Sequence, residues 1–98
     1  EYRIHDSDYS QFTHAIHELR AIRMRDGAIR WGVFRDTAAP ERIVENFVVE
    51  SWLEFLRERE RMTSSDRLLR DHARSFHRGD EPPAASYMVY ARERTQSG

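Results

Sequence analysis

The sequence predicts an α+β domain, and two periodicities lead to this class. The segments 28–36, 42–50 and 86–92 alternate with the period of two typical of strands, and each has apolar residues on both faces. Between and before them, apolar residues recur at steps of three and four, the period of a helix. With a short first strand, the order is strand, helix, strand, strand, two helices, strand. This order is the β-α-β-β-α-β, ferredoxin-like arrangement with one extra helix.

The N-terminal part predicts a strand followed by one long helix. Residues 1–5 form the strand, with Tyr2 and Ile4 pointing inward. The helix spans about Asp8 to Arg25, and Gly27 is a suitable stop because glycine tolerates the left-handed conformation at helix ends. One apolar stripe follows this helix, made of Tyr9, Phe12, Ile16, Leu19 and Ile22.

The middle of the chain predicts a hairpin of two strands. Ala28 to Asp36 is the first strand and Arg42 to Glu50 is the second, joined by a turn that contains Pro40. In the first strand Ile29, Trp31 and Val33 are expected on one side and Phe34 on the other. In the second, the same alternation sets Ile43, Phe47 and Val49 against Val44 and Val48.

Two capped helices and a last strand complete the prediction. Ser51 can cap a helix from Trp52 to Met62, whose apolar face would be Trp52, Phe55, Leu56 and Met62. The segment "TSSD" at 63–66 can cap another from about Ser65 to His77, and the last strand is expected at Ala85 to Arg92. The second of these helices has a predicted inward stripe of Leu68, Leu69, His72, Ala73 and Phe76.

The apolar residues on both strand faces predict a homodimer. Right-handed crossovers place both helical connections on one face of the sheet, so the other face is bare. A sheet with a solvated face would alternate apolar and polar residues cleanly. Two such sheets packed face to face would cover the apolar surface. We expect Trp31, Tyr87 and Val89 at this interface.

Composition limits the classes of function. The 98 residues form one domain, 1–98, without cysteine and without a run of the ~20 apolar residues of a membrane span. All 16 basic residues are arginine, but they alternate with 17 acidic ones to a net charge of −1, which argues against a nucleic-acid partner. The chain begins with Glu1 rather than methionine, and we interpret it as either a piece of a longer protein or a processed product.

Three residues are candidates for chemistry, although none belongs to a recognised catalytic pattern. Trp52 would either line a pocket and stack on an aromatic ligand or fill the corner between strand and helix. His72 would be either a hydrogen-bonded core histidine or an acid or base in a pocket. Asn46 would either orient a ligand or bond across the dimer.

The histidines do not predict a metal site. His72 and His77 are five residues apart, which is a poor spacing for one helix face, and His14 and His17 have no obvious third ligand.

The segment 47–83 resembles a known family. A strand ending in Glu50, then Ser51 and Trp52, then a short helix is similar to the antibiotic-biosynthesis-monooxygenase-like dimeric α/β barrels. The whole chain resembles more narrowly the C-terminal soluble domain of enterobactin-exporter-like transporters of the major facilitator superfamily. This resemblance is carried by "RAIRMRDGAIRWGVFRD", "ENFVVESWLEFLRERER" and "FHRGDEPP".

The resemblance implies a homodimer with a pocket between sheet and helices in each protomer. For this chain the pocket would involve Trp52, Phe55, His72 and Phe76, and its ligand would be a small aromatic molecule. Catalytic relatives use oxygen without a metal site in the protein, and haem-degrading members have an asparagine on the first strand. Here Arg59 stands where relatives usually have histidine, and the first strand has no asparagine.

These departures favour a non-catalytic domain without a cofactor. We expect it on the cytoplasmic side of a membrane exporter, where it would dimerise or sense a ligand together with the rest of the transporter chain. The alternative is a free cytoplasmic, cofactor-independent monooxygenase acting on an aromatic or quinol-type molecule, with Trp52, Asn46 and His72 at its site.

Overall fold

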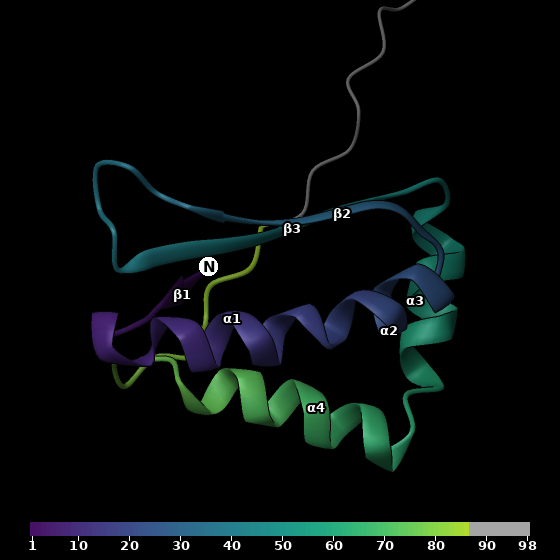
Figure 1. Cartoon of the computed structure of the whole chain (residues 1–98). Helices are drawn as coiled ribbons and strands as arrows, with labels where there is room; N and C mark the ends of the chain where they lie inside the picture. Colours follow the sequence, from purple (N-terminus) through teal and green to yellow (C-terminus); the bar gives the residue numbers. More distant parts are fainter. Residues whose placement is uncertain (87–98) are drawn as a thin grey trace, which may run out of the picture.

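The computed structural model describes residues 1–86 as an open antiparallel sheet with helices on one side (Figure 1). The strands β1 (Tyr2–Arg3), β2 (Ala28–Arg35) and β3 (Arg42–Val49) are arranged in the order β1-β3-β2. The predicted α+β class is confirmed, and the arrangement is compatible with a ferredoxin-like fold. Within residues 1–86 the sheet does not close into a barrel. The helices are η1 (Asp6–Asp8), α1 (Tyr9–His17), α2 (Leu19–Arg25), α3 (Trp52–Glu60) and α4 (Ser64–Ser75).

The long N-terminal helix is divided into α1 and α2 at Glu18, which corrects the prediction of one continuous helix. The Glu18 amide donates to the carbonyl of Ala15 at 3.2 Å, so the chain tightens there to an i→i−3 turn. The predicted stripe is nonetheless buried on both sides of this turn, in Phe12, Ile16, Leu19 and Ile22. Gly27 has a φ of +110°, as expected for its place after the helix.

The hairpin forms as predicted, with one irregularity. Trp31 lies opposite Phe47 and Phe34 opposite Val44, so the two faces of the hairpin alternate in register. The register shifts between Ala28 and Arg30, which is typical of a β-bulge. Ile29 lies at this shift and is 50% exposed, so the bulge removes it from the buried side where its alternation with Trp31 would have placed it.

Helix α4 begins at a capping box but turns a different face inward than expected. The Asp66 amide donates to the Thr63 hydroxyl, and the Thr63 amide donates to the Asp66 carboxylate, both at 3.1 Å. Asp66 and Ala73 are buried, whereas Leu68 is 71% exposed and His72 is exposed. The core histidine considered for His72 is therefore wrong. Docking against α1 and α2 selects the face of Asp66, Leu69, Ala73 and Phe76.

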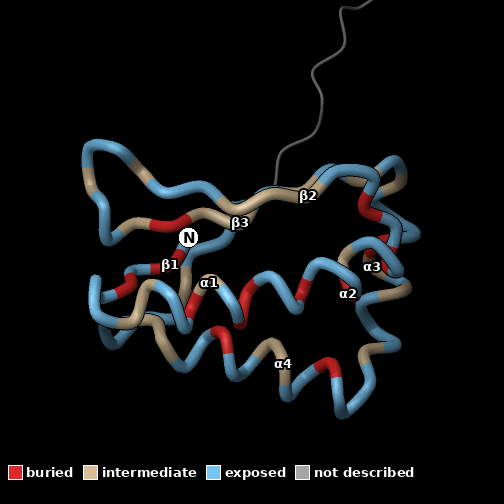
Figure 2. The backbone as a smooth tube through the Cα atoms, in the orientation of Figure 1, coloured by how far each residue is buried: buried red, intermediate tan, exposed pale blue. Residues whose placement is uncertain are grey.

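The core lies between the helices and the sheet (Figure 2). Tyr2 and Ile4 are buried there, as predicted, and the Phe12 ring packs on the Tyr2 ring with centroids 5.1 Å apart. The core is formed by Tyr2, Ile4, Phe12, Ala15, Ile16, Leu19, Ile22, Ile43 and Ala73.

The chain returns to β1 after α4. His77 forms an isolated antiparallel bridge with Ile4, and the Arg78 amide donates to the carbonyl of Arg3 at 2.8 Å. The Arg3 amide donates to His77 Nδ1 at 2.9 Å. The predicted last strand, Ala85 to Arg92, lies beyond this segment. Its residues 87–92, with Tyr87 and Val89 of the expected interface, lie outside the described residues, and 85–86 are not in a strand.

Candidate functional site

The face of the hairpin turned away from the helices is one candidate surface in the described chain (Figure 1). It combines three β3 residues with the three β2 residues opposite them. Phe34 is 61% exposed and Val48 is 45% exposed, while Val44 is half-buried and Asn46 is exposed. We call this set the open sheet face, and its members are Arg30, Gly32, Phe34, Val44, Asn46 and Val48.

The Phe34 ring lies over Gly32 on this face. A methyl group at Gly32 would lie 2.9 Å from two ring carbons of Phe34, Cε2 and Cζ, which is closer than carbon atoms can approach. A side chain at position 32 would therefore displace the Phe34 ring from this place, where it covers part of the half-buried Gly32. The Phe34 ring thus lies on the same face as Asn46, which is opposite Gly32 in register.

The other face of the same hairpin carries a buried ion pair. Arg23 of α2 reaches the Glu45 carboxylate with two hydrogen bonds of 3.0 and 3.2 Å, and the Trp31 indole donates to the same carboxylate at 2.8 Å. The Arg23 side chain is 14% exposed and that of Glu45 is 6% exposed. The Arg23 guanidinium also lies 5.0 Å from the centroid of the Phe47 ring.

This network fills part of the space between sheet and helices. Burial raises the pKa of the Tyr2 phenol, and the Glu45 carboxylate adds to the effect because it disfavours a second negative charge nearby. Among the described residues, no buried side-chain nitrogen or oxygen lacks a hydrogen-bond partner.

The expectation that Trp31 lies in a sheet–sheet interface is corrected by this geometry. Its ring contacts His17 of α1, with centroids 5.2 Å apart, and packs against the core on the helix side. The alternation predicted Trp31 and Phe34 on opposite sides correctly, but it could not say which side meets the helices. Phe34 occupies the open sheet face instead.

The four residues expected to line one ligand pocket lie in two places. Trp52 stacks on Phe55 with centroids 5.6 Å apart, and Phe55 packs against Phe47 of β3 at 5.5 Å. Phe55 is buried, while Trp52 is 44% exposed. This cluster lies where α3 meets the end of the hairpin.

His72 and Phe76 instead contribute to a groove between α1 and α4. Their rings are in edge contact at 5.2 Å, and the groove has a volume of about 490 Å³. Its lining is completed by Ser10, Gln11 and His14. His14 also pairs with Glu18 at 3.4 Å. In the described residues no three His, Cys, Asp or Glu side chains gather as metal ligands would.

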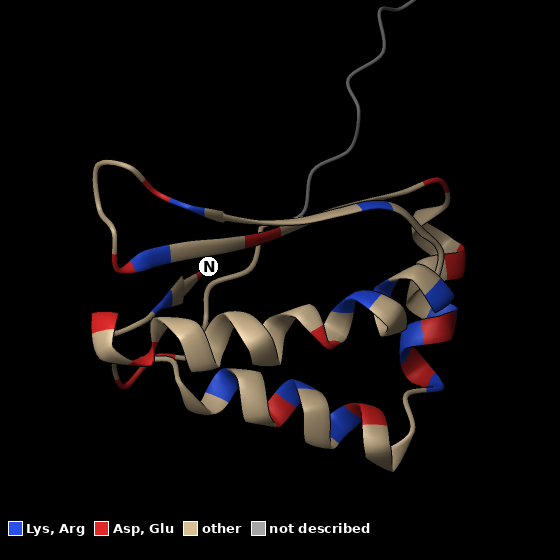
Figure 3. Ribbon diagram, in the orientation of Figure 1, with Lys and Arg blue, Asp and Glu red and all other residues tan. Residues whose placement is uncertain are grey.

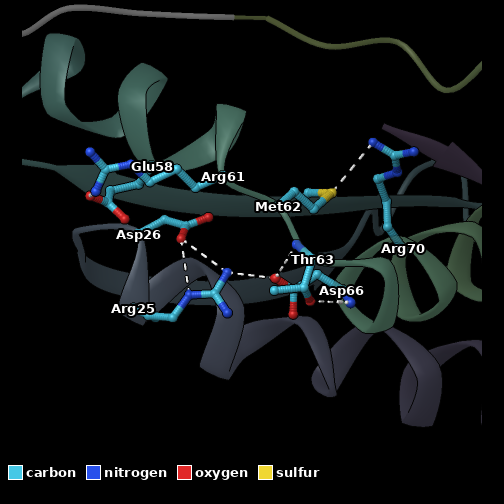
Figure 4. Close-up of polar contacts among 8 residues, drawn as sticks. All are labelled: Arg25, Asp26, Glu58, Arg61, Met62, Thr63, Asp66 and Arg70. Atoms are coloured by element: carbon cyan, nitrogen blue, oxygen red, sulfur yellow. Dashed lines mark hydrogen bonds and ion pairs between the residues drawn. The ribbon is translucent and has the colours of Figure 1, made fainter.

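A second ion-pair cluster joins α2 to α4 (Figure 4). Arg25 donates to Asp66 at 2.7 Å and to the buried Asp26 at 3.2 Å. The hydrogen bond from Arg25 holds the pKa of Asp66 below its ordinary value, and the Thr63 amide acts in the same direction. The cluster fixes the N-terminus of α4, so it is structural rather than a site open to a ligand.

The sequence analysis missed both Arg23 and Glu45. A signal was present, because Glu45 occupies an inward position between Ile43 and Phe47 on β3. An acidic residue among inward apolar positions needs a cationic partner. Arg23 directly follows the stripe residue Ile22, but only the docking of α2 on the sheet shows that it is this partner.

Comparison with known proteins gives one match, over residues 1–96, to a family model described as a transmembrane secretion effector. The chain belongs to the transmembrane secretion effector family. This membership supports the origin in a membrane transporter of the major facilitator type that the resemblance implied. Neither the curated proteins nor the solved structures that were compared gave a match. No helix within residues 1–86 is both long and apolar enough to cross a bilayer.

Proposed function

We propose that this domain is a non-catalytic homodimerisation module of a membrane exporter, placed on the cytoplasmic side of the membrane. Two transporter chains would be held together by their open sheet faces. The observation that carries the proposal is the apolar surface of Phe34, Val44 and Val48, which no helix of the described chain covers (Figure 1). Burying such a surface contributes about 25 cal/mol per Å².

The charge pattern of the rest of the surface supports a protein partner rather than an anionic one. Arginines alternate with acidic residues along α4, so this helix presents no patch of a single sign (Figure 3). The residues of the open sheet face include one charged side chain, Arg30. A surface of this kind fits another apolar sheet better than it fits nucleic acid or anionic lipid headgroups.

The monooxygenase alternative has less support in the geometry. It would need Trp52, His72 and Asn46 around one substrate. Asn46 is on the open sheet face, and His72 is in the groove between α1 and α4. Trp52 is the first residue of α3, and its ring is stacked on that of Phe55. These three positions lie in different parts of the fold.

Ligand sensing is a second candidate function because of the groove between α1 and α4. Its volume of about 490 Å³ falls in the range of small-molecule sites, and His14, His72 and Phe76 offer polar and aromatic contacts. Titration with hydroquinone, followed by NMR, tests this candidate. Shifts of Phe76 that are lost in His72→Ala would support it, and unchanged spectra at millimolar hydroquinone would reject it.

The mass of the chain in solution tests dimerisation. We expect sedimentation equilibrium to give twice the 11.7 kDa of one chain. Phe34→Asp should give the monomer mass with an unchanged circular dichroism spectrum, because a carboxylate would be buried in the interface. Leu68→Asp is the matched control, since Leu68 is an exposed apolar residue on α4. A wild-type mass that stays at one chain at all concentrations would reject the proposal.

A further inference from the structure

Asn46 is the one uncharged polar side chain among the apolar residues of the open sheet face. It lies between Val44 and Val48 on β3 and opposite Gly32 on β2, which has no side chain. Asn46 is exposed, and its amide makes no hydrogen bond with another described residue. Within residues 1–86 this amide is therefore open to solvent, and a second sheet on the open sheet face would exclude that solvent.

A buried amide requires partners for both of its functions. It has an N–H₂ group that donates and a carbonyl that accepts, and leaving either without a partner costs roughly 1–3 kcal/mol. Phe34, Val44, Val48 and Gly32 carry no side-chain hydrogen-bonding group. Arg30 could donate to the Asn46 carbonyl, but it cannot accept from the amide N–H₂.

An asparagine side chain is complementary to another asparagine side chain. Two amides related by a two-fold axis exchange two reciprocal N–H···O bonds, which satisfies the facing donor and acceptor of each. In a symmetric dimer a residue meets its own copy only at the axis, because every other contact joins two different positions.

The rim of the open sheet face favours a second copy as the occupant. Arg30 forms no ion pair with a described residue, and neither does Glu50, which follows β3 at the same end of the hairpin. A surface with an unpaired charge of each sign around an apolar centre can be complementary to itself. An anionic membrane surface would leave the Glu50 carboxylate opposed by like charge.

We propose that Asn46 lies on the two-fold axis of the homodimer and pairs with Asn46 of the second copy, which fixes the register of the two sheets. This inference rests on the proposed dimerisation through the open sheet face. A single buried asparagine fixes the register of coiled coils in the same way, because any slipped register leaves its amide unpaired.

Single-cysteine variants test this position, and the absence of native cysteine makes the background clean. Asn46→Cys, Val44→Cys and Val48→Cys are oxidised under identical conditions and separated on a non-reducing gel. Disulfides can bridge two packed sheets, and they require Cβ atoms about 3.5–4.5 Å apart. We expect Asn46→Cys to form the covalent dimer roughly ten times faster than either neighbour, because only the axial position meets its own copy.

A register test complements the cross-linking. The double variant carries Asn46→Val together with Val44→Cys. Because it has no amide at position 46, a shift of one sheet along the other no longer leaves a buried amide unpaired. We therefore expect it to form cross-links that Val44→Cys alone does not form. Unchanged cross-linking in the double variant would overturn the register role of Asn46.

The outcomes separate this inference from the proposed function. Faster cross-linking at Val44→Cys or Val48→Cys would keep the sheet dimer and overturn the axial position of Asn46. A dimer mass with no cross-link at any of the three positions would also overturn the inference and place the contact elsewhere. A monomer mass for the wild-type chain would reject both.

Discussion

The two faces of the β2–β3 hairpin differ in whether their polar side chains have hydrogen-bond partners. On the helix side, Glu45 is buried and receives hydrogen bonds from Arg23 and Trp31. On the open sheet face, the neighbouring residue Asn46 makes no hydrogen bond with a described residue. Within residues 1–86, the polar groups of the helix side therefore have partners, whereas the Asn46 amide on the open sheet face has none.

This contrast separates groups that stabilise one chain from groups available to a partner. Removing a partner from the paired face leaves a charge in a low-dielectric interior, which costs several kcal/mol. We expect a change at Asn46 on the open sheet face to leave the single chain almost as stable and to alter only the proposed association. The four predictions below run from the largest expected effect on stability to the smallest.

Glu45→Ala should produce the largest loss of stability. It leaves the Arg23 guanidinium and the Trp31 indole without their acceptor in a buried place, so we expect the free energy of unfolding to fall by about 3–5 kcal/mol. Urea denaturation measures this loss. Glu41→Ala is the control, because Glu41 is exposed in the turn directly before the same strand. Equal losses in the two variants would contradict the contrast between the faces.

Thr63→Ala should weaken the start of α4. Its hydroxyl accepts from the Asp66 amide, and losing an N-cap of this kind lowers the free energy of unfolding by about 1 kcal/mol. Thermal unfolding followed by circular dichroism at 222 nm would detect the change. Ser65→Ala, an exposed site in the first turn of the same helix, should leave the midpoint unchanged. A shift as large at Ser65 as at Thr63 would argue against the capping role.

The Arg25–Asp66 pair should make stability depend on acidity. Its hydrogen bond lowers the pKa of Asp66, so the contribution is fully present above the ordinary value of 3.8 and is lost as the pH falls through the lower folded-state pKa. Arg25 is half exposed, so solvent screens the pair and the effect is modest. The difference in unfolding free energy between wild type and Asp66→Asn should narrow below pH 3.8. If the difference in unfolding free energy between wild type and Asp66→Asn stays constant down to low pH, the Arg25–Asp66 pair does not make stability depend on pH.

Asn46→Val should change the stability of the single chain least. Its amide has no partner within the described chain, so we expect the free energy of unfolding of the dissociated chain to stay within about 0.5 kcal/mol. Unfolding is measured in the Phe34→Asp background, which we expect to dissociate the proposed dimer and so to report on the single chain. A loss of several kcal/mol would show that Asn46 is structural and would break the comparison between the faces.

The strands and helices were predictable because their signals are local. The stripe from Phe12 to Ile22, the hairpin, the cap at Ser51 and the stop at Gly27 all follow from spacing and from residue type. The α+β class and the inward positions of Tyr2 and Ile4 came from the same signals.

The candidate site was less predictable because alternation does not say which face meets the helices. Trp31 and Phe34 were correctly predicted on opposite sides of the sheet. Trp31 was expected on the side without helices, but it packs against the core, and Phe34 is the residue exposed on the side without helices. The same limit explains His72, since the inward face of α4 depends on how it docks against α1 and α2.

The amino-acid sequence by itself determined the periodicities, the caps and the order of the elements, because these depend on residues within a few positions of one another. The tertiary structure decided which sheet face is covered, that Glu45 pairs with Arg23, and that Asn46 is left exposed. These are contacts between segments distant in the chain, and docking geometry rather than local spacing brings them together.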